Sequence, residues 1–535
     1  MLKHKKIFWY VLSLCSAILL YISAIPSALW YLNFIAFIPF LSITDEVQKG
    51  TRPILNFALQ LIVLLFAFYL SVGFWVLQTA HLGFIIGILI VIPFLILLLP
   101  YVIILKRNRI LAYIYFVTSW MAAEFIQNYF ELGSPFYNLG HSLGANPKLI
   151  QWYSVTGAAG GTFWILIVNI ALYSLIRRIT VGKRWISRAI IAICILVIPM
   201  LVSITMYYSY KEKGISSEIL VVHPCTDNAN VKYQLNIYDL LNIYLNIALP
   251  QITDQTDYVV FPETAITNTG WIKDYNRNLV FQHWFQQTAN FPKLKLVTGA
   301  IAYEAIPNVE KIKHYKKIPG IRYSEKYKRW YYTYNTALQL EVGQPVQMRV
   351  KEGLVPYQEY APYPRILPRM SPVGIDFQFS KREDNCMVFT SSNQQKTAAL
   401  ICYETVYSNL FAQATHQGAQ AFFVLLNEGW YSKIKVSRQF LQLSVIRAIE
   451  NRRSIAHCSN LGISAVINQR GDIIKQTQSK QATFLKSSIY MNRNKTIASV
   501  FGNYIGIIAI VLVVFVGVRE LFQHLFIKRK TDQRF

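Results

Sequence analysis

Apolar residues are concentrated in the first part of the chain, up to about residue 210, and again close to its end. A helix needs about 20 apolar residues to cross a bilayer, and eight apolar runs approach that length. They predict transmembrane helices at residues 7–24, 28–43, 54–77, 82–105, 110–127, 161–176, 189–208 and 499–518. The second run is short and contains Pro39, so we expect its helix to be the least regular.

The long stretch between the seventh and eighth predicted helices has a different pattern. Short apolar runs of strand length alternate there with stretches of helical periodicity. We expect strands at residues 218–222, 258–261, 296–301, 336–340, 398–401, 421–426 and 464–467, and helices at 231–248 and 439–451. Strands that alternate with helices are typical of a layered α/β domain. The chain is therefore predicted to consist of seven transmembrane helices (1–210), an inserted α/β domain (211–497) and an eighth helix with a basic tail (498–535).

Basic residues outnumber acidic ones, with 53 Lys and Arg against 27 Asp and Glu. This excess does not require a nucleic-acid partner, because much of it lies in alternate loops between the predicted helices, where positive charge marks the cytoplasmic side. These positions are Lys3, Lys5, Lys6, Lys106, Arg107, Arg109, Arg177, Arg178, Lys183, Arg184, Arg188, Arg519, Lys528, Arg529, Lys530 and Arg534. The pattern predicts that both termini are cytoplasmic and that the α/β domain lies on the opposite side of the membrane.

The amino terminus also has features of a cleaved signal peptide, namely a basic start and small residues after the first apolar run. However, the run is longer than a signal core, and further helices follow it directly. We therefore expect the first helix to stay in the protein.

A second basic segment, residues 311–329, lies inside the predicted α/β domain and mixes Lys and Arg with Tyr and Trp. This composition suits contact with an anionic phospholipid surface. It suits a solvated basic loop equally well, and the sequence leaves both interpretations open.

The chain has six cysteines, with no CxxC pair and no Cys/His cluster of zinc spacing. The spacing therefore predicts neither a metal site nor a disulfide framework. Whether Cys225 and Cys386 form a disulfide stays open.

Three motifs at predicted strand ends carry reactive groups. The run 397–401 ends in Cys402, and Glu404 follows two residues later. A thiol on a sharp strand-to-helix turn is an exposed nucleophile in many folds, although a lone cysteine after a strand is more often a buried small hydrophobic residue. Glu263 ends another strand in Pro-Glu-Thr-Ala, and Lys351 begins Lys-Glu-Gly-Leu-Val-Pro. A carboxylate, an ammonium group and a thiol together can perform acyl transfer.

The order of these motifs resembles a known family. Pro-Glu-Thr-Ala, Lys-x-x-Leu-Val-Pro-x-x-Glu-Tyr-x-Pro and Ile-Cys-Tyr-Glu resemble the carbon–nitrogen hydrolase (nitrilase) superfamily. Their place between seven helices and one more is similar to the bacterial apolipoprotein N-acyltransferases. Further matching segments are Tyr-Asn-Thr-Ala (334–337), Asn-Glu-Gly-Trp-Tyr (427–431), Arg-Ala-Ile-Glu (447–450), Asn-Leu-Gly-Ile-Ser-Ala (460–465) and Trp120 to Glu124. The resemblance covers essentially the whole chain and implies that the domain is a nitrilase-like αββα sandwich.

The resemblance and the chemistry of the groups together suggest roles. Glu263 is expected to act as the base for Cys402 and then as the acid for the leaving group, because burial beside a thiol makes a carboxylate more basic. Lys351 and the backbone N–H of Tyr403 are expected to stabilise the oxyanion. Glu359 resembles the second glutamate of the superfamily, which holds the lysine and orients the incoming amine. Structural support alone is the alternative for Glu359.

Four other residues have less specific assignments. Glu404 is expected to fix the turn after the nucleophile through hydrogen bonds. Trp430 is a candidate for lining a substrate pocket, with a place in the core as the alternative. Glu124 is an ionisable group in a predicted membrane helix, which makes it a functional candidate, although we favour a role in tying the helices to the domain. His141, where the family commonly has Tyr, is a candidate for binding substrate.

By this likeness, the protein is expected to be a monomeric enzyme of the bacterial inner membrane with its α/β domain in the periplasm. It would move an sn-1 acyl chain from a glycerophospholipid, through a Cys402 thioester, to the N-terminal amine of a diacylated apolipoprotein, without a cofactor or a nucleic acid. Two alternatives stay open. A membrane-tethered amidase or nitrilase acting on a small amide would share all three motifs, although eight helices exceed what a tether needs. A non-catalytic membrane scaffold or transporter is disfavoured because none of the three motif residues is missing.

Overall fold

The computed structural model of the chain describes residues 2–24, 29–72, 83–131, 133–227, 231–307, 321–356, 358–360, 363, 379–382, 386–430, 434–478 and 481–532. The chain divides into two compact units. Met1–Met206 and Asn503–Phe535 form the first, which we call the helical unit. Tyr207–Gly502 forms the second, the α/β unit.

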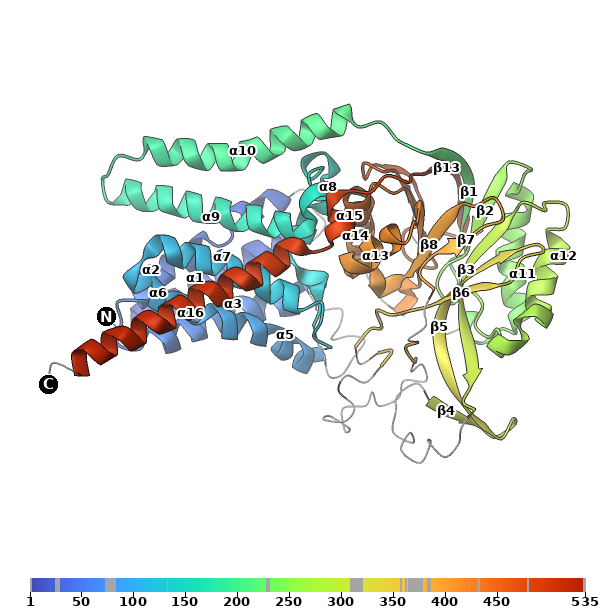
Figure 1. The fold of residues 1–535 in the computed structure, drawn as a ribbon, viewed down its shortest axis with the longest axis horizontal. Helices are drawn as coiled ribbons and strands as arrows, with labels where there is room; N and C mark the ends of the chain where they lie inside the picture. Colours follow the sequence, from blue (N-terminus) through green and yellow to red (C-terminus); the bar gives the residue numbers. More distant parts are fainter. Residues whose placement is uncertain are drawn as a thin grey trace. The chain divides into compact units, whose positions relative to one another are not determined.

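The helical unit consists of apolar helices (Figure 1). These are α1 Leu2–Ala24, α2 Ile38–Val47, α3 Pro53–Val72, α5 Gly83–Leu98, α6 Tyr101–Arg107, α7 Arg109–Ile126, α9 Ala158–Thr180, α10 Ile186–Ser209 and α16 Tyr504–Asp532. Between α7 and α9 the chain forms short helical turns, η2 Pro135–Tyr137, η3 Leu139–Ala145, η4 Pro147–Leu149 and α8 Tyr153–Thr156. Within the described residues, five stretches are long and apolar enough to cross a membrane, namely Lys6–Ala24, Pro53–Leu70, Ile90–Arg107, Ala158–Thr180 and Ile186–Ser209.

The second predicted membrane helix, at residues 28–43, is not continuous. The structure has a 3₁₀ turn, η1 (Trp30–Phe34), followed by α2. Pro39 lies in the first turn of α2, where its missing N–H has no helical partner to lose, so it begins a helix instead of continuing one. The ten residues of α2 extend about 15 Å, roughly half of the hydrocarbon thickness of a bilayer. This segment is therefore too short to cross a membrane as one straight helix.

The α/β unit contains two sheets. The first has the strand order β13-β1-β2-β3-β5-β4, with β6 paired to β5. Its strands are β1 Ile215–His223, β2 Thr256–Val260, β3 Lys295–Ala305, β4 Ile321–Ser324, β5 Arg329–Glu341, β6 Gln347–Val350 and β13 Thr483–Met491. The second has the order β12-β11-β10-β9-β8-β7. Its strands are β7 Phe389–Thr390, β8 Lys396–Ile401, β9 Ala421–Leu426, β10 Ile455–Ser459, β11 Ala465–Ile467 and β12 Ile473–Gln476.

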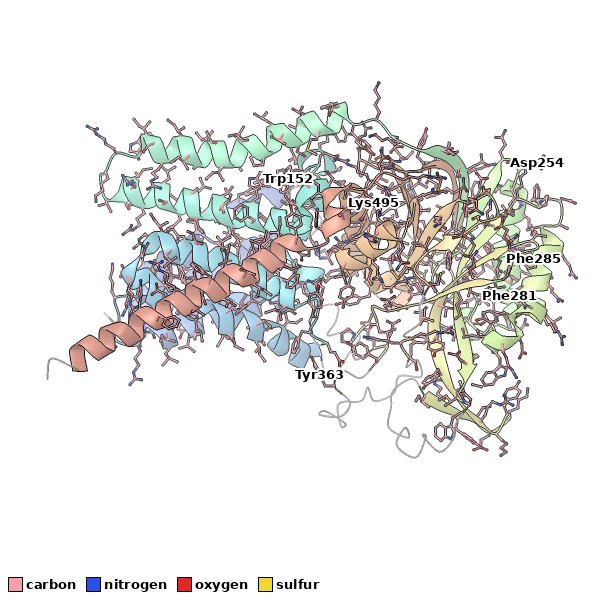
Figure 2. All side chains as sticks on the ribbon, in the orientation of Figure 1. Trp152, Asp254, Phe281, Phe285, Tyr363 and Lys495 are labelled. Atoms are coloured by element: carbon pink, nitrogen blue, oxygen red, sulfur yellow. The ribbon has the colours of Figure 1, made fainter. Side chains whose placement is uncertain are left out.

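Helices cover the outer face of each sheet (Figure 1). α11 (Ile237–Ala248) and α12 (Leu279–Gln287) pack on the first sheet through one apolar core, to which Phe281 contributes a buried ring and Phe285 a partly buried one (Figure 2). α13 (Ser408–His416) and α14 (Ile434–Asn451) lie beside the second sheet. The unit is thus a layered α/β sandwich, in agreement with the alternating pattern of its sequence.

The inner faces of the two sheets pack against each other. The ring of Tyr258 on β2 lies 5.2 Å from that of Phe423 on β9, measured between centroids, and its hydroxyl lies 3.0 Å from Ser391 Oγ. Side chains alternate along β5, so that Tyr334 and Leu338 join the core under the helices. The intervening residues, Asn335 among them, point between the sheets. The candidate site is built in this inner layer.

Candidate active site

Cys402 lies directly after β8, on the first residue of the 3₁₀ turn η10 (Cys402–Val406). Its φ of +48° is in the left-handed region, which is unfavourable for a residue with a side chain. Such a conformation persists only where the surroundings hold it. The side chain of Glu404 supplies part of this restraint, because its Oε2 accepts the N–H of Ile401 at 2.7 Å. The thiol is therefore raised on a sharp turn at the end of a strand.

Glu404 connects this turn to the segment that carries Lys351. It is fully buried and forms a two-pronged ion pair with Arg349 on β6, at 2.6 Å (Nη1–Oε2) and 2.8 Å (Nη2–Oε1). Its Oε1 also accepts the N–H of Glu352 at 2.7 Å. Burial would raise the pKa of Glu404, but the guanidinium of Arg349 outweighs burial and lowers the pKa below its ordinary value. Glu404 thus holds Cys402 and Lys351 in fixed relation.

Lys351 bridges two carboxylates between the sheets. Its Nζ lies 3.0 Å from Oε1 of Glu263, which follows β2, and 2.8 Å from Oε1 of Glu359. Nδ2 of Asn335 donates to the same two oxygens, at 2.8 Å and 3.2 Å. The second oxygen of Glu263 accepts the backbone N–H of Asn427 at 2.9 Å. The structure therefore brings Lys351 into direct contact with both Glu263 and Glu359, three residues predicted from two separate motifs.

The electrostatic environment links Cys402 to this cluster. Burial and the nearby carboxylate of Glu263 raise the pKa of the Cys402 thiol well above its ordinary value, although Lys351 opposes them. Burial would lower the pKa of Lys351, but Glu263 and Glu359 reverse this effect and raise it. Burial also raises the pKa of Glu359, against the effect of Lys351. At neutral pH the lysine is charged and the thiol protonated, so the nucleophile needs a base.

Lys232 is a second buried lysine beside the cluster, and the sequence pattern assigned it no role. Its Nζ donates to the backbone carbonyl of Glu263 and to Oγ1 of Thr264, both at 2.8 Å. Thr264 has a φ of +49°, so these bonds hold a strained turn that carries Glu263. Burial lowers the pKa of Lys232 to about 7.

Replacing Lys232 with methionine should flatten the pH dependence of stability between pH 7 and pH 10. The pKa of Lys232 is about 7 in the folded protein, below its ordinary value of 10.5. Between these values the unfolded chain binds more protons than the folded one, so Lys232 makes stability rise with pH. Thermal unfolding of both proteins in detergent at several pH values measures this slope. The control is Lys475→Met on the exposed strand β12. Equal slopes in wild type and Lys232→Met would contradict the expectation.

The other predicted residues are distributed as follows. Tyr403 is buried and directly follows Cys402 in η10. Its ring contacts that of Tyr407 edge-on, with 5.7 Å between the ring centroids. Trp430 ends η11 (Glu428–Trp430), and its side chain lies outside the described residues. Cys225 and Cys386, which the sequence left as a possible disulfide, are separate thiols.

Glu124 and His141 belong to the helical unit. Oε1 of Glu124 accepts bonds from Trp120 Nε1 (3.1 Å) and the N–H of Leu139 (2.8 Å), and Oε2 accepts one from Thr162 Oγ1 (2.7 Å). Glu124 therefore ties α7, η3 and α9 together inside this unit. His141 is buried in η3.

Two family models match this chain. That of the apolipoprotein N-acyltransferase N-terminal domain matches residues 16–171, and that of the carbon-nitrogen hydrolases matches residues 233–495, which include the cluster around Lys351. The chain belongs to the apolipoprotein N-acyltransferase family. The resemblance found in the strand-end motifs and the membrane helices is thereby confirmed, and so is the nitrilase-like class of the α/β unit.

Members of this family are similar over most of the chain. A protein of Rickettsia prowazekii named apolipoprotein N-acyltransferase is 23% identical over 416 residues, which are 77% of this chain and 77% of its own. One of Pasteurella multocida with the same name is 23% identical over 523 residues, 93% of either chain. Among solved structures, Saccharomyces cerevisiae Nit3, a member of the nitrilase superfamily, overlaps 51% of this chain and 90% of its own, with 14% identity and a TM-score of 0.34.

Proposed function

We propose that this protein is an apolipoprotein N-acyltransferase that moves an sn-1 acyl chain from a glycerophospholipid to the N-terminal amine of a diacylated lipoprotein. The observation that carries the proposal is the contact of Lys351 with both Glu263 and Glu359, within electrostatic reach of the Cys402 thiol, in a chain of this family. A thiol, a carboxylate and a fixed cation are the groups that acyl transfer through a thioester requires.

In the first half-reaction, the Cys402 thiol gives its proton to the Glu263 carboxylate and its sulfur attacks the ester carbonyl of the phospholipid. The oxyanion that forms is stabilised by the Lys351 ammonium and the backbone N–H of Tyr403. The C–O bond then breaks, Glu263 returns the proton to the departing oxygen, and lysophospholipid leaves. Cys402 retains the acyl chain as a thioester, which stays reactive toward amines.

In the second half-reaction, the lipoprotein amine attacks the thioester carbonyl and Glu263 takes a proton from the amine nitrogen. The C–S bond breaks, the amide forms and the thiol regains a proton from Glu263. Glu359 contacts Lys351, and its side chain is 13% exposed, more than those of Glu263 and Lys351. This exposure suits a role in orienting the incoming amine. The reaction is therefore ping-pong.

A membrane setting fits both lipid substrates. Five described stretches of membrane-spanning length, and basic residues in alternate loops, support an inner-membrane protein with cytoplasmic termini and a periplasmic α/β domain. In this topology the chain crosses the bilayer eight times, and η1 and α2 together make the second crossing in place of one straight helix. In this arrangement residues 1–210 and 498–535 hold the protein in the bilayer and residues 211–497 carry the chemistry. Confinement to a membrane brings donor and acceptor to the enzyme in two dimensions.

Acyl transfer in a defined membrane tests the function. The protein is placed in nanodiscs with phospholipid labelled in its sn-1 chain, and a synthetic peptide with an N-terminal diacylglyceryl-cysteine is added. We expect labelled peptide and lysophospholipid in equal amounts. Release of ammonia from small amides, with no lysophospholipid, would instead support the amidase alternative. Absence of both reactions would support a non-catalytic scaffold.

A further inference from the structure

The carboxylate pair is held by two donors, of which only one is charged. Oε1 of Glu263 and Oε1 of Glu359 each accept a bond from Lys351 Nζ and another from Asn335 Nδ2. Four hydrogen bonds thus join two acceptor oxygens to two donor nitrogens in a closed ring. Lys351 brings one positive charge to two carboxylates, and Asn335 adds two N–H donors without adding a charge.

The position of Asn335 in the sheet makes this contact rigid. Asn335 lies within β5, between its partners β3 and β6, and its backbone carbonyl accepts the N–H of Lys351 at 2.8 Å. The same residue therefore fixes the lysine through its backbone and the two carboxylates through its side chain. Asn335 is 1% exposed, so water does not compete for the amide.

The orientation of the amide shows what holds it. Oδ1 of Asn335 is buried and has no hydrogen-bond partner among the described residues. A buried acceptor without a partner costs free energy, which a side chain that merely fills space would avoid. Ala337, two residues along the same face of β5, is fully buried and fills this inner layer without any polar group. The hydrogen bonds that Nδ2 donates to the two carboxylates are therefore the contacts that offset the free-energy cost of burying this amide.

We propose that Asn335 is a positioning residue that holds the carboxylate of Glu263 beside that of Glu359 and orients it to take the Cys402 proton. The role rests on the proposed function, since it concerns the same base. A hydrogen bond donated to a carboxylate favours the charged state, and it also offsets the repulsion between two neighbouring carboxylates. Without Asn335, the pair binds a proton more readily and Glu263 loses its fixed orientation.

A pH profile distinguishes this role from simple packing. The titratable groups that face the pair are Lys351, Lys232, Tyr233, Cys402 and Glu428. None of these groups loses a hydrogen bond when the Asn335 side chain is replaced, whereas both carboxylates of the pair do, so a shift of the acidic limb of the pH profile reports on the pair. We expect Asn335→Ala to lower kcat/KM about 10- to 100-fold at pH 8, by analogy with the loss found when a residue that orients a metal ligand through a hydrogen bond is removed. The acidic limb of the kcat/KM profile of this variant should move to higher pH.

Asn335→Asp gives the sharpest contrast, because it keeps the shape and replaces the donor by a carboxylate. At pH 8 three carboxylates then share one lysine, and the loss should exceed that of Asn335→Ala. As the pH falls toward 5, the new carboxyl takes a proton and donates one hydrogen bond, so activity relative to Asn335→Ala should recover. The matched control is Thr336→Val on the same strand, whose buried hydroxyl bonds to the carbonyl of Ala300 at 2.9 Å. Its profile should keep the wild-type shape.

A second readout does not depend on the lipid reaction. The rate at which iodoacetamide alkylates Cys402 is measured by mass spectrometry of its peptide across the same pH range. The proposal would be supported if the acidic limb of the alkylation rate moved in Asn335→Ala and the alkylation rate of Asn335→Asp recovered at low pH. This would hold even if wild type transferred no acyl chain. If both variants keep the wild-type limb in alkylation, the role of Asn335 is overturned, whatever the wild-type transfer activity. Uniform losses without a change of profile shape would overturn it as well.

Discussion

Replacing Cys402 with alanine is expected to abolish acyl transfer, with a rate loss on the order of 10⁶, the size found when a hydrolase loses its nucleophile. The thiol is the group that forms the acyl intermediate, and the remaining groups can only activate water. Cys402→Ser should be almost as inactive, because a hydroxyl at this position lacks the nucleophilicity of sulfur. Radiolabel transfer from phospholipid to the lipoprotein peptide measures the loss.

Cys458 provides a matched control for Cys402. It is also a buried thiol whose pKa is raised by burial, but it lies within β10 and donates to the carbonyls of Val222 and Val260 at 3.3 Å and 3.4 Å. Cys458→Ala should therefore keep its activity. All three variants should insert into membranes like wild type. Substantial transfer by Cys402→Ala would refute the assignment of the nucleophile.

Replacing Arg349 with methionine should destabilise the α/β unit by about 3–5 kcal/mol, because the charge of Glu404 is left buried without its partner. Both side chains of this ion pair are 0% exposed, so solvent cannot compensate. Transfer activity should fall as well, since Glu404 fixes the turn of Cys402 and the segment of Lys351 together. Thermal unfolding in detergent measures the stability. The control is Lys328→Met, which removes an exposed ion pair with Glu325 and should cause no measurable change.

The double variant Arg349→Met, Glu404→Leu separates the effect of losing the ion pair from the effect of leaving the charge of Glu404 buried without a partner. It should recover part of the stability, because no buried charge remains, but not the activity. The pKa of Glu404 is lowered by folding, so the stability that its ionised form contributes is present above the unfolded pKa of about 4.3 and disappears as the pH falls. The difference between wild type and Arg349→Met should therefore narrow below pH 4. If the single variant Arg349→Met were as stable as wild type at pH 7, the role of this ion pair would be contradicted.

Much of the candidate site could be predicted from the sequence because its residues directly follow strands with strong patterns. Glu263 comes after the apolar run of β2, and Cys402 comes after that of β8. Each of these strands runs parallel to a neighbour, and residues beyond the carboxyl ends of parallel strands gather at one edge of a sheet. Lys351 could be found because a distinctive Leu-Val-Pro follows it closely.

The residues that hold the site together could not be found in this way. Arg349 is 55 positions from Glu404, and Asn335 is 72 positions from Glu263, so neither contact leaves a local trace. Lys232 lies in an irregular segment, and only folding shows which carbonyl its ammonium group meets.

Two helix boundaries predicted from the sequence were wrong, in each case because of local backbone chemistry. The helix predicted at 231–248 begins at Ile237, because the side chain of Asn236 accepts the N–H groups of Tyr238 and Asp239 and caps it. In the second predicted membrane segment, apolar composition favoured one long helix, whereas the chain forms a 3₁₀ turn and then a new helix that begins at Ile38, with Pro39 in its first turn. Capping and proline chemistry overrode the hydrophobic pattern in both places.

Mass spectrometry of the protein after incubation with phospholipid alone tests the central claim most directly. If the reaction passes through a thioester, the peptide that contains Cys402 gains the mass of one acyl chain, and the gain disappears when the amine acceptor is added. The Lys351→Met variant should form much less of this adduct. An acyl chain found instead on Cys225 or Cys458, or turnover without any adduct on Cys402, would contradict the account.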